Sequence, residues 1–94
     1  MLHHILVKWT EEVVNKASLS AEVERLFQGV LTVDGVHGVT VHPNVVNRPN
    51  RYDLLIRIDM DEAALPAYDD CETHHRWKDE YGHLVAKKAI FDCE

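Results

Sequence analysis

One short stretch of the chain gathers most of the residues that could do chemistry. Residues 68–91 read YDDCETHHRWKDEYGHLVAKKAIF, with two adjacent histidines close to tyrosine and tryptophan. His74 stands near the expected start of a helix, where the positive helix end disfavours an imidazolium ion. We therefore expect a neutral imidazole that can accept a proton. Trp77 and Tyr81 follow at i+3 and i+7 on the same helix face, where they would form an apolar wall beside this base.

Two further side chains could act together with His74. Tyr68 could donate a hydrogen bond to a developing enolate oxygen. His3 shares one face of an expected strand with apolar residues, so it would point into the layer between helices and sheet and would need a polar partner there. Structural roles stay open for all three: a space-filling histidine bonded to the backbone, a tyrosine that anchors the helices, and a core histidine.

The seven histidines do not favour a metal site. His75 and His83 lie eight residues apart, about two helical turns, which is too far for them to chelate one ion together. Adjacent histidines have side chains that diverge on a strand or a helix. A site that combined His3 with His74 would still need a third ligand, so we predict no metal.

The composition is that of one small globular domain spanning residues 1–94. The chain is 46% hydrophobic and 28% charged, which argues against disorder. Its net charge of -6 opposes nucleic-acid binding. No apolar run approaches the length of a membrane span, the first residues lack the basic region of a signal peptide, and two cysteines do not make a disulfide scaffold. We therefore expect a cytoplasmic protein with no membrane partner.

The hydrophobic periodicity predicts strand, helix, strand, strand, helix, strand. This is the ferredoxin-like βαββαβ arrangement, an α+β fold with a four-stranded, mainly antiparallel sheet and helices on one face. Leu6 and Leu55 would point to the other face, and a second copy of the sheet is the expected cover. The predicted strands are residues 2–9, 36–42, 52–60 and 87–93, and the predicted helices are 18–32 (capped by Ser18 or Ser20), a short one from Asp61 that Pro66 disturbs, and 74–86 (capped by Thr73).

Four pieces of the sequence carry a resemblance to a known family: HHILVKW at 3–9, VDGVHGVTV at 33–41, YDLLIRID at 52–59, and LPAY…H…Y…KKAIFD at 65–92. In their order and spacing they resemble the stress-responsive dimeric α/β-barrel (Dabb) family, and together they span nearly the whole chain. The resemblance implies a homodimer in which two sheets pack face to face as a dimeric α+β barrel. It also implies that no cofactor is needed, and most members lack a known activity.

The chain is also distantly similar to a plant member of that family, olivetolic acid cyclase, which closes a linear tetraketide by an aldol step. By this similarity His74 and Tyr68 would be catalytic, and His3, Ile5, Val7 and Trp77 would bind substrate. Tyr81 joins the substrate-binding residues because it shares the helix face of His74 and Trp77. Cys71 stands where many members have the first histidine of a His-Pro-x-His motif, so the substrate does not transfer. We expect a Dabb-type stress-responsive protein with a small apolar pocket between sheet and helices. The alternative is a cofactor-independent enzyme, cyclase-like or monooxygenase-like, with His74 as general base.

Overall fold

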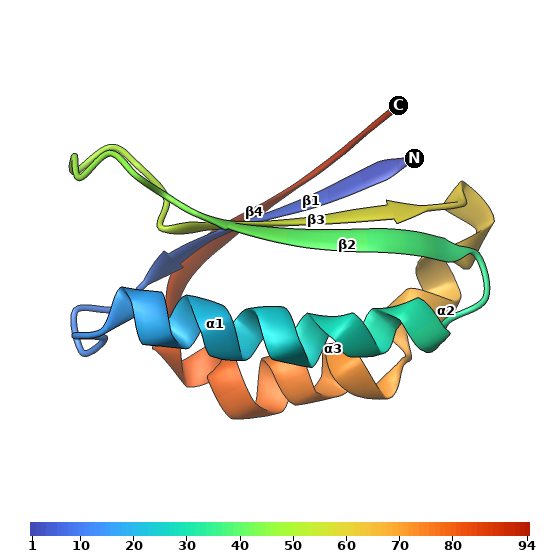
Figure 1. Ribbon diagram of the computed structural model, residues 1–94, viewed down its shortest axis with the longest axis horizontal. Helices are drawn as coiled ribbons and strands as arrows, with labels where there is room; N and C mark the ends of the chain where they lie inside the picture. Colours follow the sequence, from blue (N-terminus) through green and yellow to red (C-terminus); the bar gives the residue numbers. More distant parts are fainter.

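A computed structural model describes all of residues 1–94 as one antiparallel sheet with helices packed on a single face (Figure 1). The strands lie in the order β2-β3-β1-β4, which confirms the predicted ferredoxin-like α+β fold. The main elements are β1 (Leu2–Trp9), α1 (Lys16–Phe27), β2 (Val36–Pro43), β3 (Leu54–Met60), α2 (Leu65–Asp69), α3 (Glu72–Arg76) and β4 (Val85–Cys93).

Strand β1 lies in the interior of the sheet and pairs with both β3 and β4. Ile5 stands opposite Ile56 on one side and Ile90 on the other. Every second residue of β1 is buried, beginning with His3 and ending with Trp9, while the residues between them are half-buried. This confirms the predicted face of the strand and carries His3 into the layer beneath the helices.

Helix α1 begins earlier than predicted and changes its geometry before it ends. Asn15, and not Ser18 or Ser20, caps it by accepting a hydrogen bond from the backbone N–H of Ser18 at 3.0 Å. After Phe27 the chain tightens into a 3₁₀ helix, Gln28–Thr32. Because a 3₁₀ turn holds fewer residues than an α turn, the end of the predicted helix is rotated, and Leu31 there is 45% exposed.

The third strand starts at Leu54 and not at residue 52, because Asp53 is used to fix the strand end. Its carboxylate accepts hydrogen bonds from the backbone N–H of Trp9 at 2.8 Å and from the ammonium of Lys16 at 3.0 Å. Tyr52, the first residue of the predicted strand, lies outside it. Its ring carries the Lys87 ammonium 5.2 Å above its centroid.

The predicted second and third helices are a series of short turns. A 3₁₀ turn at Glu62–Ala64 leads into α2, which has Pro66 in its first turn as expected from the ring's fixed φ. Cys71 and not Thr73 caps α3, since its sulfur accepts from the backbone N–H of His74 at 3.4 Å. A π-helical turn at Trp77–Tyr81 and a 3₁₀ turn at Gly82–Leu84 then bring the chain to β4, which begins at Val85 and not at residue 87.

Aromatic rings join the helices to the sheet. The ring of Trp77 meets Phe27 of α1 edge-on with centroids 5.5 Å apart, and meets Trp9 of β1 edge-on at 6.1 Å. All three rings are buried, so this contact fixes the segment after α3 against both its neighbours. No helix in the structure combines the length and apolar character needed to cross a membrane.

Gly29 lies so close to α3 that its missing side chain matters. A Cβ at this position would stand 2.2 Å from Oγ1 of the buried Thr73, whereas a Cβ at Gly82 would meet nothing within 4 Å. We predict that Gly29→Ala lowers the free energy of unfolding by about 1–3 kcal/mol through this overlap. Gly82→Ala should leave it unchanged or raise it slightly. Urea unfolding of both variants checks this.

The overlap can be tested further by removing the hydroxyl that causes it. Thr73→Ala should cost less in the Gly29→Ala background than in the wild type, because it opens the space that the new methyl group needs. Additive losses for the two substitutions would contradict the proposed contact.

Candidate functional site

A cavity of about 260 Å³ lies between the β1–β4 side of the sheet and the segments α2 and α3. Strand β1 supplies His3, α2 supplies Tyr68 and α3 supplies His74, so the three polar residues singled out from the sequence meet around one space. Ile5 and Trp77, both expected as pocket walls, also line it. The complete lining is His3, Ile5, Leu65, Tyr68, Asp69, His74, Trp77, Lys88, Ile90 and Asp92.

Two of the residues expected to bind substrate lie outside this lining. Val7 is fully buried in the core between the sheet and the helices. Tyr81 follows Trp77 in a π turn, so its ring stacks on the Trp77 ring at 5.8 Å instead of continuing an α-helical face. Its hydroxyl reaches a carboxylate oxygen of Glu22 on α1 at 3.5 Å.

The three polar side chains form a row of rings. The Tyr68 ring stands between the two imidazoles, 5.3 Å from the His3 centroid and 4.9 Å from the His74 centroid. The side chain of Tyr68 is completely buried, while His74 is only half-buried. The row therefore runs from the interior of the sheet layer toward the protein surface.

His3 is held by an aspartate that the sequence reasoning did not single out. Its Nδ1 lies 2.5 Å from Oδ1 of Asp92, the residue directly opposite it on β4. Because a carboxylate only accepts, Nδ1 carries the hydrogen in this contact and Nε2 is the nitrogen left for another partner. The need for a partner was foreseen from the burial of His3. The identity of that partner follows only from the β1–β4 register.

His74 is oriented by the backbone of α2. Its Nδ1 lies 2.8 Å from the carbonyl oxygen of Asp69, so Nδ1 donates and Nε2 of the neutral ring keeps its lone pair. Burial lowers the pKa of His74, and the nearby ammonium groups of Lys78 and Lys88 lower it further, against the opposing effect of the Asp69 carbonyl. The neutral form expected from a helix end is thus favoured mainly by loss of solvent.

The hydroxyl of Tyr68 is buried and has no hydrogen-bond partner. Burial raises the pKa of Tyr68, with smaller contributions from Cys71 and Asp69, so the hydroxyl keeps its proton. Leaving a buried polar group unpaired costs about 1–3 kcal/mol. A donor left unpaired beside a cavity is a group that a ligand oxygen can satisfy.

The remaining histidines lie away from the cavity lining. His75 faces Asp70 at 3.3 Å and His37 faces Asp61 at 2.9 Å, both on the surface. No group of three histidine, cysteine, aspartate or glutamate side chains is placed to hold a metal ion. Both cysteines are free thiols.

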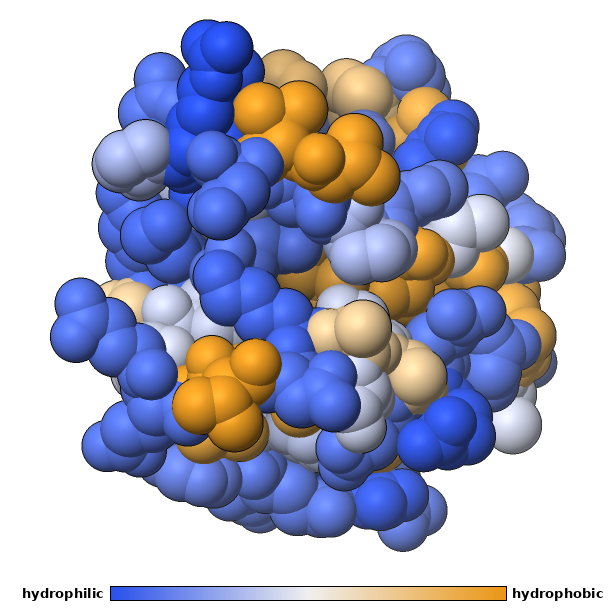
Figure 2. Space-filling view, turned by 60° about the vertical axis from the view of Figure 1, so that its left-hand side comes forward, coloured by the Kyte–Doolittle hydropathy of each residue, from blue (hydrophilic) through white to orange (hydrophobic).

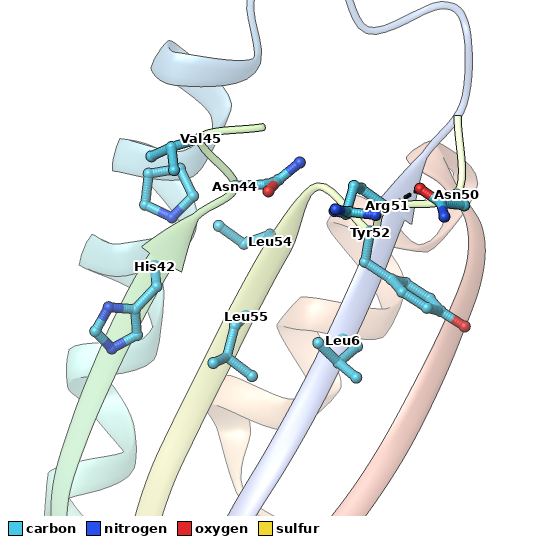
Figure 3. A pocket seen from close by; sticks show the side chains of 10 residues that line it. Leu6, His42, Asn44, Val45, Asn50, Arg51, Tyr52, Leu54 and Leu55 are labelled. Atoms are coloured by element: carbon cyan, nitrogen blue, oxygen red, sulfur yellow. Dashed lines mark hydrogen bonds between the residues drawn. The ribbon is translucent and has the colours of Figure 1, made fainter. Parts of the chain in front are cut away.

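A larger hollow, of about 400 Å³, lies on the sheet face that the helices leave open. Figure 3 shows Leu6, Leu55 and His42 side by side on three neighbouring strands, with the helices behind the sheet. Residues of the β2–β3 connection, among them Tyr52, close one end of it. None of the seven residues expected to bind or react borders this hollow, so we regard the smaller cavity as the candidate site.

Comparison with known proteins supports the fold and leaves the activity open. No family model matches the chain, and no curated protein matches it. Solved structures do. A dimeric ferredoxin-like protein of unknown function from Bacteroides fragilis has a TM-score of 0.80 at 13% identity, with 99% of this chain and 93% of that chain covered.

Two other similar structures have more informative descriptions. A Dabb family protein with a ferredoxin-like fold from Mesorhizobium loti has a TM-score of 0.67 at 16% identity, over 99% of this chain and 93% of the other. A putative antibiotic biosynthesis monooxygenase from Bacteroides thetaiotaomicron has a TM-score of 0.74 at 17% identity, over 100% and 87%. At these identities the likeness establishes the ferredoxin-like fold alone.

The lowered pKa of His74 predicts a pH dependence of stability. The unfolded chain, with an ordinary histidine pKa of 6.5, binds a proton more strongly than the folded one does. The contribution of His74 to the free energy of unfolding is therefore complete above about pH 6.5 and is lost as the pH falls toward the folded pKa. His74→Gln should lose less stability than the wild type between about pH 7 and pH 5, as measured by urea unfolding.

The same property can be observed directly in the proton resonance of the His74 ring. Its NMR titration midpoint should lie below 6.5. A midpoint at or above that value would contradict the effects of burial and of the two lysines.

Proposed function

We propose that this chain is a Dabb-type protein that binds a small apolar or aromatic ligand in the cavity and works as a homodimer. The motifs quoted above and the Mesorhizobium loti neighbour support the family assignment, and the stress-responsive role belongs to the same proposal. The observation that carries the ligand proposal is the Tyr68 hydroxyl. It is a buried donor without a partner, and Tyr68 lines a cavity whose other walls include Ile5, Leu65 and Trp77.

The dimer proposal rests on the uncovered sheet face. Leu6 and Leu55 stand opposite each other there, and the paired strands place Phe91, 62% exposed, on the same face next to His4. Figure 2 shows hydrophobic patches interrupting a largely hydrophilic surface at the end of the molecule that carries the β2–β3 connection. Burying an apolar sheet face against a second copy would give a small domain the core area that it lacks alone. The Bacteroides fragilis neighbour is described as dimeric, which supports a dimer.

A second candidate is a cofactor-independent enzyme in which His74 is the general base. The observation that favours it is the Asp69 carbonyl, which fixes the imidazole so that Nε2 of the neutral ring holds the free lone pair. This Nε2 would remove a proton from a carbon next to a carbonyl, and Tyr68 Oη would stabilise the enolate oxygen. An aldol closure of the cyclase kind uses such an enolate. The monooxygenase-like neighbour supports a different reaction on the same fold.

The ligand proposal predicts a specific role for the Tyr68 hydroxyl. Tyr68→Phe should weaken binding of phenylacetone, an aromatic ketone, about twofold to tenfold, because its carbonyl loses one hydrogen bond. Binding of propylbenzene, which has no oxygen, should be unchanged. The variant without ligand should be at least as stable as the wild type, since an unpaired buried hydroxyl has been removed.

NMR titration gives the affinities, and denaturation gives the stability. If neither compound binds the wild type, the ligand proposal fails. If phenylacetone binds, exchange of its benzylic hydrogens in D₂O reports the second candidate, and this exchange should be lost in His74→Gln. Exchange that persists in that variant would eliminate His74 as the base.

The dimer proposal predicts that a charge on the open sheet face separates the subunits. Light scattering of the wild type should give twice the 10.8 kDa mass of the chain, and Leu55→Lys should shift the mass toward 10.8 kDa. Val14→Lys is the matched control, because Val14 is already 96% exposed and does not border the hollow on the open sheet face. A wild-type mass of one chain at micromolar concentration would refute the dimer.

A further inference from the structure

A second hollow, of about 300 Å³, opens directly beside the candidate site. The two spaces share Trp77 and Lys88 as lining residues, so they are neighbours along one wall. Lys78 comes to the second hollow from the π turn and Lys88 comes from β4. The hollow beside the candidate site is therefore bordered by lysines from two different elements.

These two ammonium groups are not neutralised within the chain. Lys78 and Lys88 take part in no salt bridge, as is true of most of the chain's lysines and arginines, among which Lys16 and Arg76 alone are paired with carboxylates. What distinguishes Lys78 and Lys88 is that both border this one hollow. Lys87 also borders this hollow, but its ammonium stands over the Tyr52 ring. Two unpaired cations in an acidic protein leave a local positive site that an anion can fill.

The carboxylates near the site make no salt bridge with the two lysines. Asp92 is engaged by His3 across the β1–β4 pair. Asp69 contributes its backbone carbonyl to His74, and its side chain is exposed and in no salt bridge with either lysine. Glu80, two residues after Lys78, pairs with Arg76 at 2.6 Å.

We infer that Lys78 and Lys88 form a subsite for an oxyanion, so that the ligand of the cavity is an apolar or aromatic molecule carrying a carboxylate or phosphate group. The anionic group would lie between the two ammonium groups beside Trp77, and the apolar body would enter the space in front of Tyr68 and His74. This substrate class makes the proposed function more specific. Only the part of the ligand that enters the cavity, its apolar body, depends on that proposed function. The anion subsite itself depends only on the two lysines.

The subsite also couples ligand binding to the protonation of His74. In the free protein Lys78 and Lys88 help to hold the pKa of His74 down. An anion between them cancels part of that repulsion, so the pKa of His74 rises and its affinity for a proton increases when ligand is bound. Binding of the anion thereby strengthens the base next to it.

The experiment compares benzoate with its neutral analogue benzamide, at constant ionic strength, by NMR titration. Benzoate should bind more tightly than benzamide to the wild type. Lys78→Gln and Lys88→Gln should each weaken benzoate about twofold to fivefold, as expected for exposed charge pairs, without changing benzamide. Lys87→Gln is the matched control, since it removes a neighbouring charge that faces Tyr52, and it should change neither affinity. The His74 midpoint should rise on adding benzoate and should also rise in Lys88→Gln.

Inorganic phosphate distinguishes the two sources of the oxyanion. Phosphate-bearing ligands are supported if phosphate displaces benzoate and does not bind the Lys78→Gln/Lys88→Gln double variant. Carboxylic acids are supported if benzoate binds and phosphate does not displace it. The subsite proposal is overturned by any of three results. The wild type binds benzoate and benzamide equally well, Lys87→Gln loses as much benzoate affinity as the other two variants, or neither benzoate nor phosphate binds. Phenylacetone binding in that case leaves the apolar cavity standing. Lysine-dependent anion binding without phenylacetone binding overturns the cavity proposal instead.

Discussion

The alternation of the inner strand β1 is the constraint on which the rest of this molecule depends. Because β1 has a neighbour on each side, its register fixes β3 and β4 together, and one face of all three strands becomes the floor of the helix layer. That face includes Ile5 and Val7, which pack the core, and His3, which does not belong in an apolar layer unless it is paired. The pairing with Asp92 across β4 meets this requirement.

The chemistry of the cavity follows from how its polar groups are shielded and paired. His3 and His74 both donate from Nδ1 to a fixed oxygen, one a carboxylate and the other a backbone carbonyl, so Nε2 is the nitrogen left free on each ring. Tyr68 between them has no such oxygen. The row therefore contains two oriented imidazoles and one hydroxyl whose hydrogen-bonding capacity is unused.

Features set by local periodicity could be predicted from the sequence, and features set by register or by irregular turns could not. The alternation around Ile56 gave the strand and its face, and the burial of His3 gave the need for a partner. Asp92 could not be named, because a shift of one residue between β1 and β4 would have moved it to the other face. Tyr81 was misplaced for a related reason: the π turn rotates the residues after Trp77 away from the α-helical period.

The π turn at Trp77–Tyr81 has a consequence for how such chains can diverge. A π turn holds one more residue per turn than an α turn and is correspondingly wider. The segment can therefore gain or lose one residue while its two ends stay in place. His74 lies before this turn and β4 lies after it, and the buried Trp77 ring anchors the segment between them. The number of residues between the imidazole and the strand is thus free to vary by one while the distance between them in space is retained. Requiring a fixed number of residues between the histidine and the last strand would therefore exclude chains that can form the same site geometry.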